Sequence, residues 1–406
     1  MSDALAVDLL LAPSVIDNPY PFYGRLRSEA PVWRVADTGV FTVSTHALVS
    51  EATSRVEDFS SNIDCLLYRD DHGLPCRISF GGDGAQVLAT ADPPAHPVHR
   101  RTVFPELVAR RMQALQPDIT SIAEHGVAAM LERGHGDFMS DVGNVVPITM
   151  ISRLIGFRNS DLEELLVAAF DSTSLLGSTL TLPELTSLIG RSGDVQTFIA
   201  GQLAAAIDDP QDDLLGAVAR GVDEQVFDET AATIMLQTLL SAGGESTTSL
   251  LGNCVRMLAQ DGSLQQHLRD HPEQIEVYIE ETLRLESPFR FHMRSVPHDT
   301  ELGGVDIAAG STVLLLWGSA NRDPHEFDRP DHIDLDRPIA RHHLGFGRGI
   351  HHCVGAPLAR LEAQTVLRVL LARTSNFELD VGRPPKWVES LMVRRHQELH
   401  LELSAS

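Results

Sequence analysis

Residues 346–355 read Phe-Gly-Arg-Gly-Ile-His-His-Cys-Val-Gly, and a single cysteine, Cys353, stands near the end of this glycine-rich stretch. A helical run from Ala356 to Thr374 follows directly. Backbone N–H groups at the start of a helix stabilise negative charge, so they favour a thiolate over a thiol. Glycines leave room for a flat ligand to approach the backbone closely. The stretch therefore predicts an anionic sulfur ligand for a metal that has other ligands; a buried cysteine that packs as a small apolar residue is the alternative.

The composition of the chain excludes several classes of protein. A chain of 406 residues with 43% hydrophobic residues can bury a large core, and no low-complexity tract indicates disorder. There is no stretch of about 20 apolar residues, and the N-terminal residues lack the basic region of a signal peptide, so we expect a cytoplasmic protein outside the membrane. The four cysteines form no C-x-x-C pair, which argues against a zinc site or a disulfide framework.

Positive charge is scarce and unevenly distributed along the chain. The formal net charge of −24 disfavours binding to nucleic acid or to an anionic membrane. Two basic segments predict a docking face for an anion or an acidic partner, unless each arginine pairs with a core carboxylate or caps a helix. Their arginines are Arg100, Arg101, Arg110 and Arg111 in the first segment and Arg341, Arg348 and Arg360 in the second.

The periodicity of apolar residues predicts a mostly helical body. Residues 31–44 alternate around a Thr-Gly turn and indicate an early β-hairpin, whereas residues 61–91 show little periodicity and indicate a long irregular loop. Helical periodicity dominates residues 98–285, and strand-like alternation returns at 302–317 and 377–403. We therefore expect a mainly α fold with small β-sheets (α+β), in which residues 1–406 form a single domain.

The longest predicted helix has an unusual middle. It extends from about Asp228, a plausible N-cap, to Ala259, which corresponds to about 48 Å. Residues 242–248 read Ala-Gly-Gly-Glu-Ser-Thr-Thr, a run of poor helix formers at the point where propensity should matter most. Such a segment can open the hydrogen-bond ladder and admit water or a small molecule. A kinked buried helix with satisfied hydroxyls is the alternative.

Two further patterns place charged side chains on one face of a helix. Glu281 and Arg284 are separated by three residues, which by itself is typical of a surface pair. The stretch Asp-Pro-Pro-Ala-His-Pro-Val-His-Arg-Arg begins at Asp92 and places His96 and Arg100 four residues apart, so both can reach one anionic group. A helix cap at Asp92 is the simpler account of this second pattern.

These four patterns resemble the motifs of cytochrome P450 enzymes and occur in that family's order. The cysteine stretch matches F-x-x-G-x-H-x-C-x-G, residues 92–100 match D-P-P-x-H-x-x-x-R, and residues 281–284 match E-x-x-R. The middle of the long helix is similar to A-G-x-[DE]-T, with Glu245 as the acid and Ser246 where the threonine usually stands. The resemblance covers most of the chain and identifies it as a member of the soluble bacterial branch.

The resemblance implies a site for haem b (iron protoporphyrin IX) between the long central helix and the helix that follows Cys353. It implies that the Cys353 thiolate is the axial ligand of the haem iron. It also implies that Glu245 and Ser246 relay protons through water, with Thr247 as the alternative to Ser246. The remaining implied residues are the cofactor contacts His96, Arg100, Arg294, His351, Phe346, Gly347, Ala242 and Gly355; the structural set Glu281, Arg284 and Arg337; and the substrate pocket Leu239, Gly243, Phe289, Phe291, His292 and Leu391.

The activity implied by the resemblance is a monooxygenase reaction. One oxygen atom from O2 would enter a small or medium-sized apolar substrate by hydroxylation or epoxidation. Electrons would come from a ferredoxin and its reductase, because the chain carries no flavin or nicotinamide motif, and we expect a monomer. Three alternatives remain: oxidative coupling or rearrangement without oxygen insertion, a peroxygenase (which Glu245 disfavours), and a haem-binding sensor without turnover.

Overall fold

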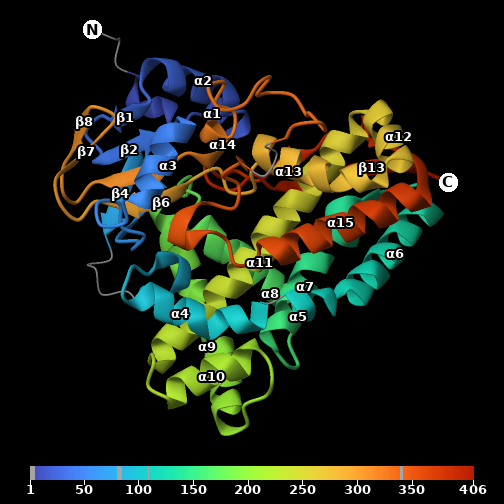
Figure 1. Ribbon diagram of the computed structural model, residues 1–406, viewed down its shortest axis with the longest axis horizontal. Coiled ribbons are helices and arrows are strands. Elements are labelled where there is room, and N and C mark those ends of the chain that lie inside the picture. Colours follow the sequence, from blue (N-terminus) through green and yellow to red (C-terminus); the bar gives the residue numbers. More distant parts are fainter. Residues whose placement is uncertain (1–4, 80–84, 108, 339–341) are drawn as a thin grey trace.

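The computed structural model describes residues 5–79, 85–107, 109–338 and 342–406. Helices form most of the body and the sheets are small, which confirms the predicted fold class (Figure 1). The longest helices are α11 (Glu229–Ala259), α9 (Leu182–Asp208), α6 (Gln116–Arg133) and α15 (Ala356–Arg373). The shorter ones are α1 (Pro13–Asp17), α2 (Tyr20–Glu29), α3 (His46–Ser54), α4 (Ala95–Val103), α5 (Ala109–Gln113), α7 (Val145–Ile155), α8 (Leu162–Ser174), α10 (Leu214–Asp223), α12 (Gly262–Asp270), α13 (Ile275–Leu285) and α14 (Trp317–Ala320).

Segments that are far apart in the sequence pair in the sheets. The largest sheet has the order β1-β2-β9-β6, with β2 and β9 parallel and the other pairs antiparallel. Its strands are β1 (Val32–Val35), β2 (Val40–Val43), β6 (His292–Ser295) and β9 (Thr312–Leu315). The other sheets combine β10 (Thr374–Leu379), β13 (His400–Ala405) and β5 (His135–Asp137); β11 (Lys386–Trp387) and β12 (His396–Glu398); β3 (Cys65–Arg69) and β4 (Pro75–Ser79); and β7 (Thr300–Leu302) and β8 (Val305–Ile307).

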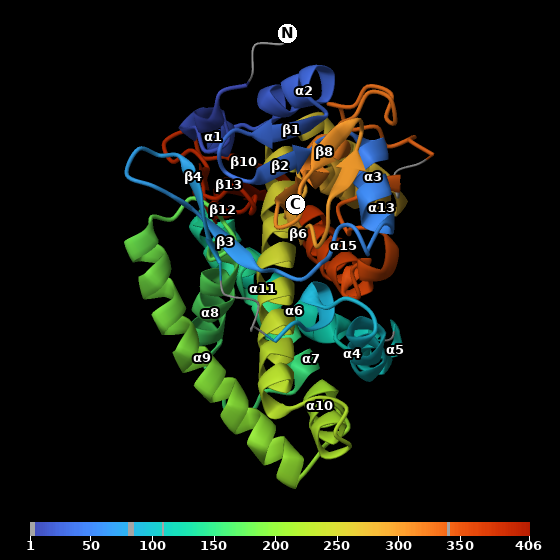
Figure 2. The same cartoon turned by 90° about the vertical axis from the view of Figure 1, so that its left-hand side faces the viewer.

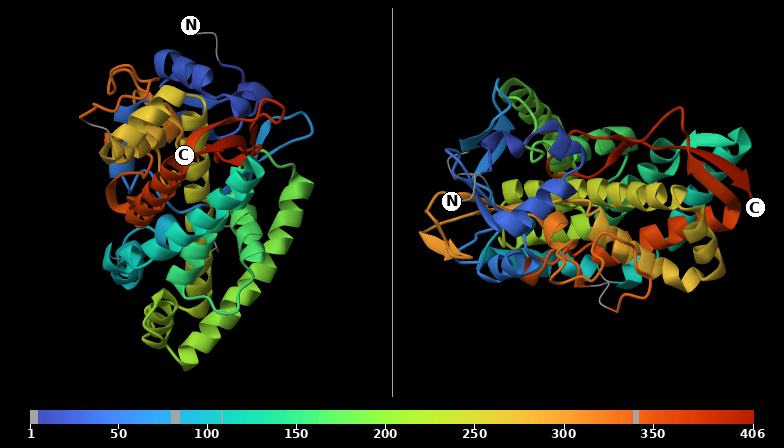
Figure 3. Two further views of the ribbon diagram at one scale, coloured as in Figure 1. Left: turned by 90° about the vertical axis from the view of Figure 1, so that its right-hand side faces the viewer. Right: turned by 90° about the horizontal axis from the view of Figure 1, so that it is seen from above.

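Helix α11 connects two hydrophobic cores. The Asp228 side chain caps it by accepting a hydrogen bond from the backbone N–H of Ala231, as the sequence predicts. Its first half packs into a core with α7, α8, α9 and α10, and its second half packs into a core with α6, α13 and α15. Figure 2 shows α11 along most of the length of the molecule with α9 running obliquely beside it, and Figure 3 shows α15 and α6 from the other side. The polar residues 242–248 therefore lie between the two cores.

The glycines in the middle of α11 have a packing role. A Cβ atom on Gly243 would lie 2.7 Å from Ile151 Cγ1, and one on Gly244 would lie 3.1 Å from the Ala169 Cβ. Glycine is therefore required for α7 and α8 to approach α11 closely. The expectation of an opened hydrogen-bond ladder is wrong, because α11 is an uninterrupted α-helix through this segment.

The loop predicted at residues 61–91 contains a hairpin. Strands β3 and β4 pair in antiparallel register from Cys65–Ser79 to Arg69–Pro75. The turn between them is stabilised by Asp70, whose Oδ1 accepts hydrogen bonds from the backbone N–H groups of His72 and Leu74. Residues 80–84 of the predicted loop lie outside the described residues.

Within the described ranges, none of the helices combines the length and the hydropathy that crossing a bilayer would require.

Candidate active site

Cys353 stands at the end of a loop that hydrogen-bonds to itself. Its backbone N–H donates to the carbonyl oxygen of Phe346 at 2.9 Å. Gly347 and Gly349 have φ angles of 68° and 73°, a left-handed conformation that glycine adopts without strain. The loop then leads into α15, which begins at Ala356 with Gly355 as its N-cap residue. The sequence thus places the sulfur at the N-terminus of a long helix.

Opposing effects act on the Cys353 sulfur. The side chain is accessible, but the protein atoms around it desolvate the thiolate, and this burial raises the pKa of the thiol. The N–H groups of Gly355 and Ala356 and the charges of Arg100 and Arg360 lower the same pKa. A metal cation would decide the balance, because a thiol that binds a metal is deprotonated. Across the part of the chain that the structure describes, no three His, Cys, Asp or Glu side chains could hold a metal together, so further ligands would have to come from a cofactor.

Basic side chains gather beside the cysteine loop. His96 on α4 and Arg294 on β6 are buried, and the His96 and His351 rings lie 4.3 Å apart. Arg100 Nη1 donates to the carbonyl oxygens of Ile350 at 3.2 Å and His352 at 3.0 Å, which ties α4 to the loop. The structure thus brings together four residues that the family resemblance implies as cofactor contacts: His96, Arg100, Arg294 and His351. We call them the donor cluster.

The donor cluster has no carboxylate partner among the described residues. Among the described residues, none of its members forms an ion pair, although the charge of Asp92 opposes the lowering of the pKa of Arg294 and of His96. Arg294 Nη1 donates to the carbonyl oxygen of Met293 at 2.7 Å. Both ring nitrogens of His351 are buried without a hydrogen-bond partner. Burial, followed by the charge of Arg294, lowers the pKa of His351 to about 3. Burial likewise lowers the pKa of Arg294 to about 10. Unsatisfied buried donors are costly, so they fit a ligand with two carboxylates, as the propionates of haem supply.

Glu245 and Ser246 face different surroundings. Ser246 Oγ donates to the Ala242 carbonyl oxygen at 2.6 Å, on the exposed side of α11. Glu245 is buried and accepts hydrogen bonds from Arg395 Nε at 2.7 Å and Thr173 Oγ1 at 2.9 Å. Burial raises the pKa of Glu245, and the Arg395 charge opposes this shift. Thr247 is also buried.

A small cavity of about 70 Å³ lies beside Glu245. It is lined by the end of α8, by the loop before α9 and by a C-terminal segment that includes Glu389 and Arg395. The sequence analysis did not identify Arg395. A volume of this size is enough for a few water molecules, each of which needs polar partners such as these.

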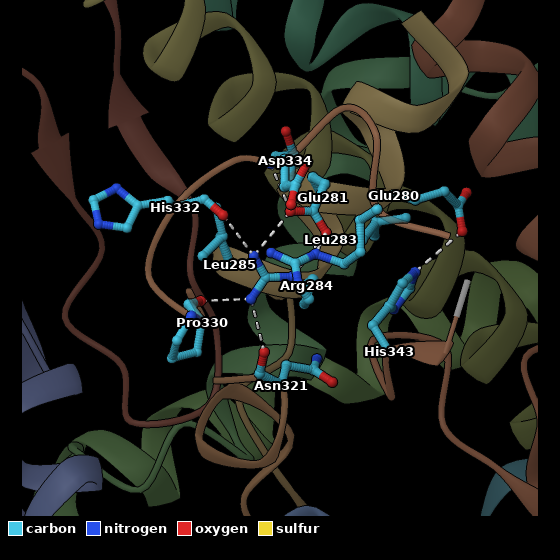
Figure 4. Close-up of polar contacts among 12 residues, drawn as sticks. Glu280, Glu281, Leu283, Arg284, Leu285, Asn321, Pro330, His332, Asp334 and His343 are labelled. Carbon is cyan, nitrogen blue, oxygen red and sulfur yellow. Dashed lines mark hydrogen bonds and ion pairs between the residues drawn. The ribbon is translucent and has the colours of Figure 1, made fainter. Parts of the chain in front are cut away.

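Glu281 and Arg284 form a buried ion pair on α13 (Figure 4). Both side chains are 0% exposed, and two hydrogen bonds of 2.8 and 2.9 Å join them. Arg337 Nε also donates to Glu281, at 3.1 Å. Arg284 donates in addition to the carbonyl oxygens of Asn321, Pro330 and His332. This cluster holds α13 to the segment that leads toward the cysteine loop.

A second buried cluster on α13 holds the cysteine loop itself. Glu280 accepts hydrogen bonds from His343 Nε2 at 3.1 Å and from Arg360 at 2.6 and 2.9 Å. Burial by itself raises the pKa of Glu280, but these hydrogen bonds bring it down to about 2. The Arg360 guanidinium lies 4.5 Å from the centre of the Phe346 ring. Arg360, predicted as part of a docking face, is therefore committed to Glu280, and Arg341 lies outside the described residues.

Only part of the predicted substrate pocket lies near the donor cluster. His292 is on β6 two residues before Arg294, and its ring packs against the edge of Phe289 at 5.5 Å. Phe291 and Leu391 are instead buried in the core of the N-terminal segments, because the alternation of a strand turns Phe291 away from His292. Gly243 faces Ile151, and Leu239 belongs to the core between α7 and α10.

Comparisons with known proteins agree with this geometry. A family model described as Cytochrome P450 matches residues 208–401. Cytochrome P450 144 of Mycobacterium tuberculosis is 39% identical over 389 residues, covering 95% of this chain and 89% of the relative. Cyclomarin C epoxidase CymV of Salinispora arenicola is 32% identical over 367 residues, covering 87% and 88%. The crystal structure of CYP109E1 from Bacillus megaterium in complex with testosterone superposes with a TM-score of 0.84 at 27% identity, covering 95% and 98%.

Proposed function

This chain belongs to the cytochrome P450 family, which makes it a haem-dependent oxidoreductase that incorporates oxygen, and we propose that it hydroxylates or epoxidises a small or medium-sized apolar substrate. One observation carries the proposal: a cysteine at a helix N-terminus lies beside a cluster of basic side chains that forms no ion pair with a described carboxylate and in which the nitrogens of His351 have no hydrogen-bond partner among the described residues. Two comparisons support the reaction and the substrate class, because one relative is named an epoxidase and one structural neighbour is described with a steroid.

The protein residues hold the cofactor in place. Cys353 would bind the haem iron, and the donor cluster would bind the two carboxylates through charge-assisted hydrogen bonds. Phe346, Gly347 and Gly355 would shape the loop against the flat ring, and Ala242 would face it from α11. When bound, haem supplies the activation of O2 and the transfer of one oxygen atom to the substrate.

Protons would enter through the α11 segment. Arg395 and Thr173 hold Glu245 next to a cavity that is large enough for water. Ser246 is the next residue along α11 and lies on the more exposed side of the helix. A carboxyl whose pKa is raised by burial exchanges protons nearer to neutral pH. We propose that Glu245 collects protons from this cavity and that Ser246 or Thr247 passes them on. Glu281, Arg284 and Arg337 are structural in this proposal.

Electrons would arrive from a ferredoxin and its reductase at the face around the cysteine loop. Arg101 and Arg348 are exposed there, and no described carboxylate pairs with either side chain. Phe104 and Ile350, which are 50% and 39% exposed, add apolar contacts, and the Arg100 guanidinium lies 6.0 Å from the centre of the Phe104 ring. This combination suits an acidic partner, because charge steers the encounter and buried apolar area holds it.

We further propose that residues 1–406 form one domain and that the protein acts as a monomer in the cytoplasm. Helix α11 supports the first statement, because it contributes to both large cores.

Turnover with isotopically labelled O2 tests the proposed reaction. The haem-loaded protein, a ferredoxin and its reductase are incubated with a panel of apolar compounds that includes steroids and alkenes. We expect one labelled oxygen atom in the product. Products without label indicate coupling or rearrangement, label supplied only by hydrogen peroxide indicates a peroxygenase, and the absence of O2 consumption with every compound indicates a sensor; each of these outcomes contradicts the proposal.

A further inference from the structure

His292 lies on the face of strand β6 that points toward the donor cluster. Side chains alternate along a strand, so His292 and Arg294 share one face, while Phe291 and Met293 share the other. Phe291 and Met293 both belong to the core of the N-terminal segments, so their face of β6 packs into this core and the face of His292 and Arg294 points away from it. His292 is also among the groups that lower the pKa of His351, which places the two side chains near one another. His292 therefore stands beside the donor cluster.

One hydrogen bond fixes which nitrogen of His292 carries the proton. Trp317 Nε1 lies 2.7 Å from His292 Nδ1, and an indole N–H is only ever a donor. Nδ1 is therefore the acceptor and carries no proton. Trp317 is 2% exposed, so its ring is held in place by the surrounding core. Burial and then the charge of Arg294 lower the pKa of His292 to about 3, so the ring is neutral at physiological pH with its single proton on Nε2.

The Nε2–H group of His292 has no acceptor among the described residues. The side chain is half-buried, and Nε2 is not among the fully buried nitrogens, so a ligand can reach this donor. The Phe289 ring packs edge-on at 5.5 Å and limits how far the imidazole can rotate. A donor that is oriented, neutral and without a partner in the chain donates to water when the site is empty, so a ligand that displaces this water has to bring an acceptor.

We propose that His292 is a fixed hydrogen-bond donor for an oxygen acceptor on a ligand of this site, and that Trp317 is the residue that positions it. This inference deepens the proposed function and rests on it. The acceptor chemistry is a carbonyl or carboxylate oxygen, and two ligands could supply it: the substrate or a haem propionate. A ligand without such an oxygen would displace water from Nε2–H and leave the donor unsatisfied, which costs about tenfold in affinity.

Three variants of the haem-loaded full chain test this proposal. His292→Phe keeps a ring and removes the donor. His292→Gln keeps an oxygen that can accept from Trp317 and an amide N–H that can replace Nε2–H. Trp317→Phe leaves His292 in place but releases the constraint on its tautomer.

Two measurements separate the two sources of the acceptor. The first is the ratio of the dissociation constants of undecane and 2-undecanone, read from the haem absorbance shift. The second is the rate at which haem transfers to apomyoglobin. If the substrate supplies the acceptor, the parent prefers the ketone about tenfold, His292→Phe loses this preference, and haem loss is unchanged. If a propionate supplies it, His292→Phe loses haem about tenfold faster and the preference is unchanged.

His292→Gln and Trp317→Phe test whether the effect of His292→Phe comes from the lost donor or only from disturbed packing. In either case His292→Gln should restore most of the effect, and Trp317→Phe should give an intermediate value. Equal haem loss and an equal ketone-to-alkane ratio in the parent and His292→Phe would overturn the proposal, whether or not the parent prefers the ketone. Failure of His292→Gln to restore a lost effect would also overturn it. If the parent takes up haem and turns over substrate, the proposed function survives such a result; a parent that takes up no haem contradicts both proposals.

Discussion

Buried arginines and histidines occur in two regions of this molecule, and they differ in what neutralises them. On α13, Glu281 lies between Arg284 and Arg337, and Glu280 lies between Arg360 and His343. Every base in these two clusters faces a carboxylate of the same chain. In the donor cluster beside Cys353, no described carboxylate forms an ion pair with a base, and Asp92 acts on Arg294 and His96 only through its charge. The ring nitrogens of His351 have no hydrogen-bond partner among the described residues.

This difference distinguishes charged side chains that stabilise the fold from charged side chains that bind a ligand. A matched buried pair completes the fold, and losing one partner leaves an uncompensated charge. An unmatched group is a cost to the haem-free chain, and the ligand that supplies the missing acceptor removes this cost. The α13 clusters should therefore matter most for stability, and the donor cluster should matter most for binding.

The largest expected effect is on stability and concerns Glu281. Glu281→Gln leaves the buried charges of Arg284 and Arg337 without their carboxylate, and we expect it to lower the free energy of unfolding by about 3–5 kcal/mol. Urea denaturation of the haem-free chain measures this loss. Glu29→Gln is the matched control, because Glu29 pairs with Arg25 on the surface of α2 and such pairs contribute less than about 1 kcal/mol. An equal effect of the two substitutions would contradict the comparison.

The opposite pattern is expected for Arg294. Arg294→Gln removes a buried charge that forms no ion pair with a described carboxylate and that Asp92 offsets only through its charge, so the haem-free chain should be as stable as the parent or more stable. Haem should be lost about 10- to 100-fold faster, the range for one charge-assisted hydrogen bond. Transfer of haem to apomyoglobin and urea denaturation give the two numbers. A loss of stability as large as that of Glu281→Gln, with haem retention unchanged, would assign Arg294 to the structural group.

Two buried glutamates should respond to pH with opposite signs. The pKa of Glu280 is about 2 in the folded chain, below its ordinary 4.5, so its contribution to stability is present above pH 4.5 and is lost as the pH falls toward 2. Glu362 on α15 has a buried oxygen without a partner, and burial raises its pKa to about 8. Its contribution is present below pH 4.5 and is lost as the pH rises toward 8.

Glutamine variants isolate these two contributions. We expect each contribution to be on the order of 1–3 kcal/mol, measured as the free energy of unfolding against pH. Glu280→Gln should flatten the acid side of the parent profile, and Glu362→Gln should flatten the decline between about pH 5 and pH 8. If Glu362→Gln instead steepens that decline, Glu362 has a partner that stabilises its charged form.

The smallest effect is expected at the surface, where charges act mainly on encounter. Arg348→Glu and Arg101→Glu should each slow the reduction of haem by an acidic ferredoxin by about two- to tenfold at low salt, and the difference should fall at high salt. Stopped-flow reduction measures this rate. Arg25→Glu on α2 is the control for a change in net charge alone. Equal slowing by all three variants would contradict the proposal that the ferredoxin docks at the face formed by Arg101 and Arg348.

Sequence reasoning succeeded where the partners are close in the chain. The Asp228 cap precedes the helix that it starts, so a local pattern was sufficient. Glu281 and Arg284 are three residues apart, so their spacing predicted a pair, although only the family resemblance implied that the pair is structural. Glu280 stands next to Glu281, but its partners His343 and Arg360 are 63 and 80 residues away. Arg395 is 150 residues from Glu245. No local spacing encodes pairs of this kind, because the tertiary fold creates them.

Other differences have a similar origin. The β3–β4 hairpin carries a readable signal in the Asp70 turn, but its strands show no clear alternation of apolar and polar residues. The glycines of α11 suggested an opened helix, whereas packing against α7 and α8 explains them. Phe291 was placed in the pocket by its position in a motif, and the phase of strand β6 turns it into the core. The cysteine loop was predictable as a candidate because its motif is short and continuous. In the donor cluster the same holds for His96 and Arg100, whereas Arg294 and His351 come from other segments and were implied only by the family resemblance.

The central claim is that the Cys353 thiolate binds the iron of haem held by the donor cluster, and the spectrum of the reduced protein with carbon monoxide tests it most directly. We predict a red-shifted band in the parent, and loss of that band in Cys353→Ser while haem remains bound through the donor cluster. A red-shifted band that persists in Cys353→Ser, or a parent chain that stays colourless when hemin is supplied, would contradict the claim.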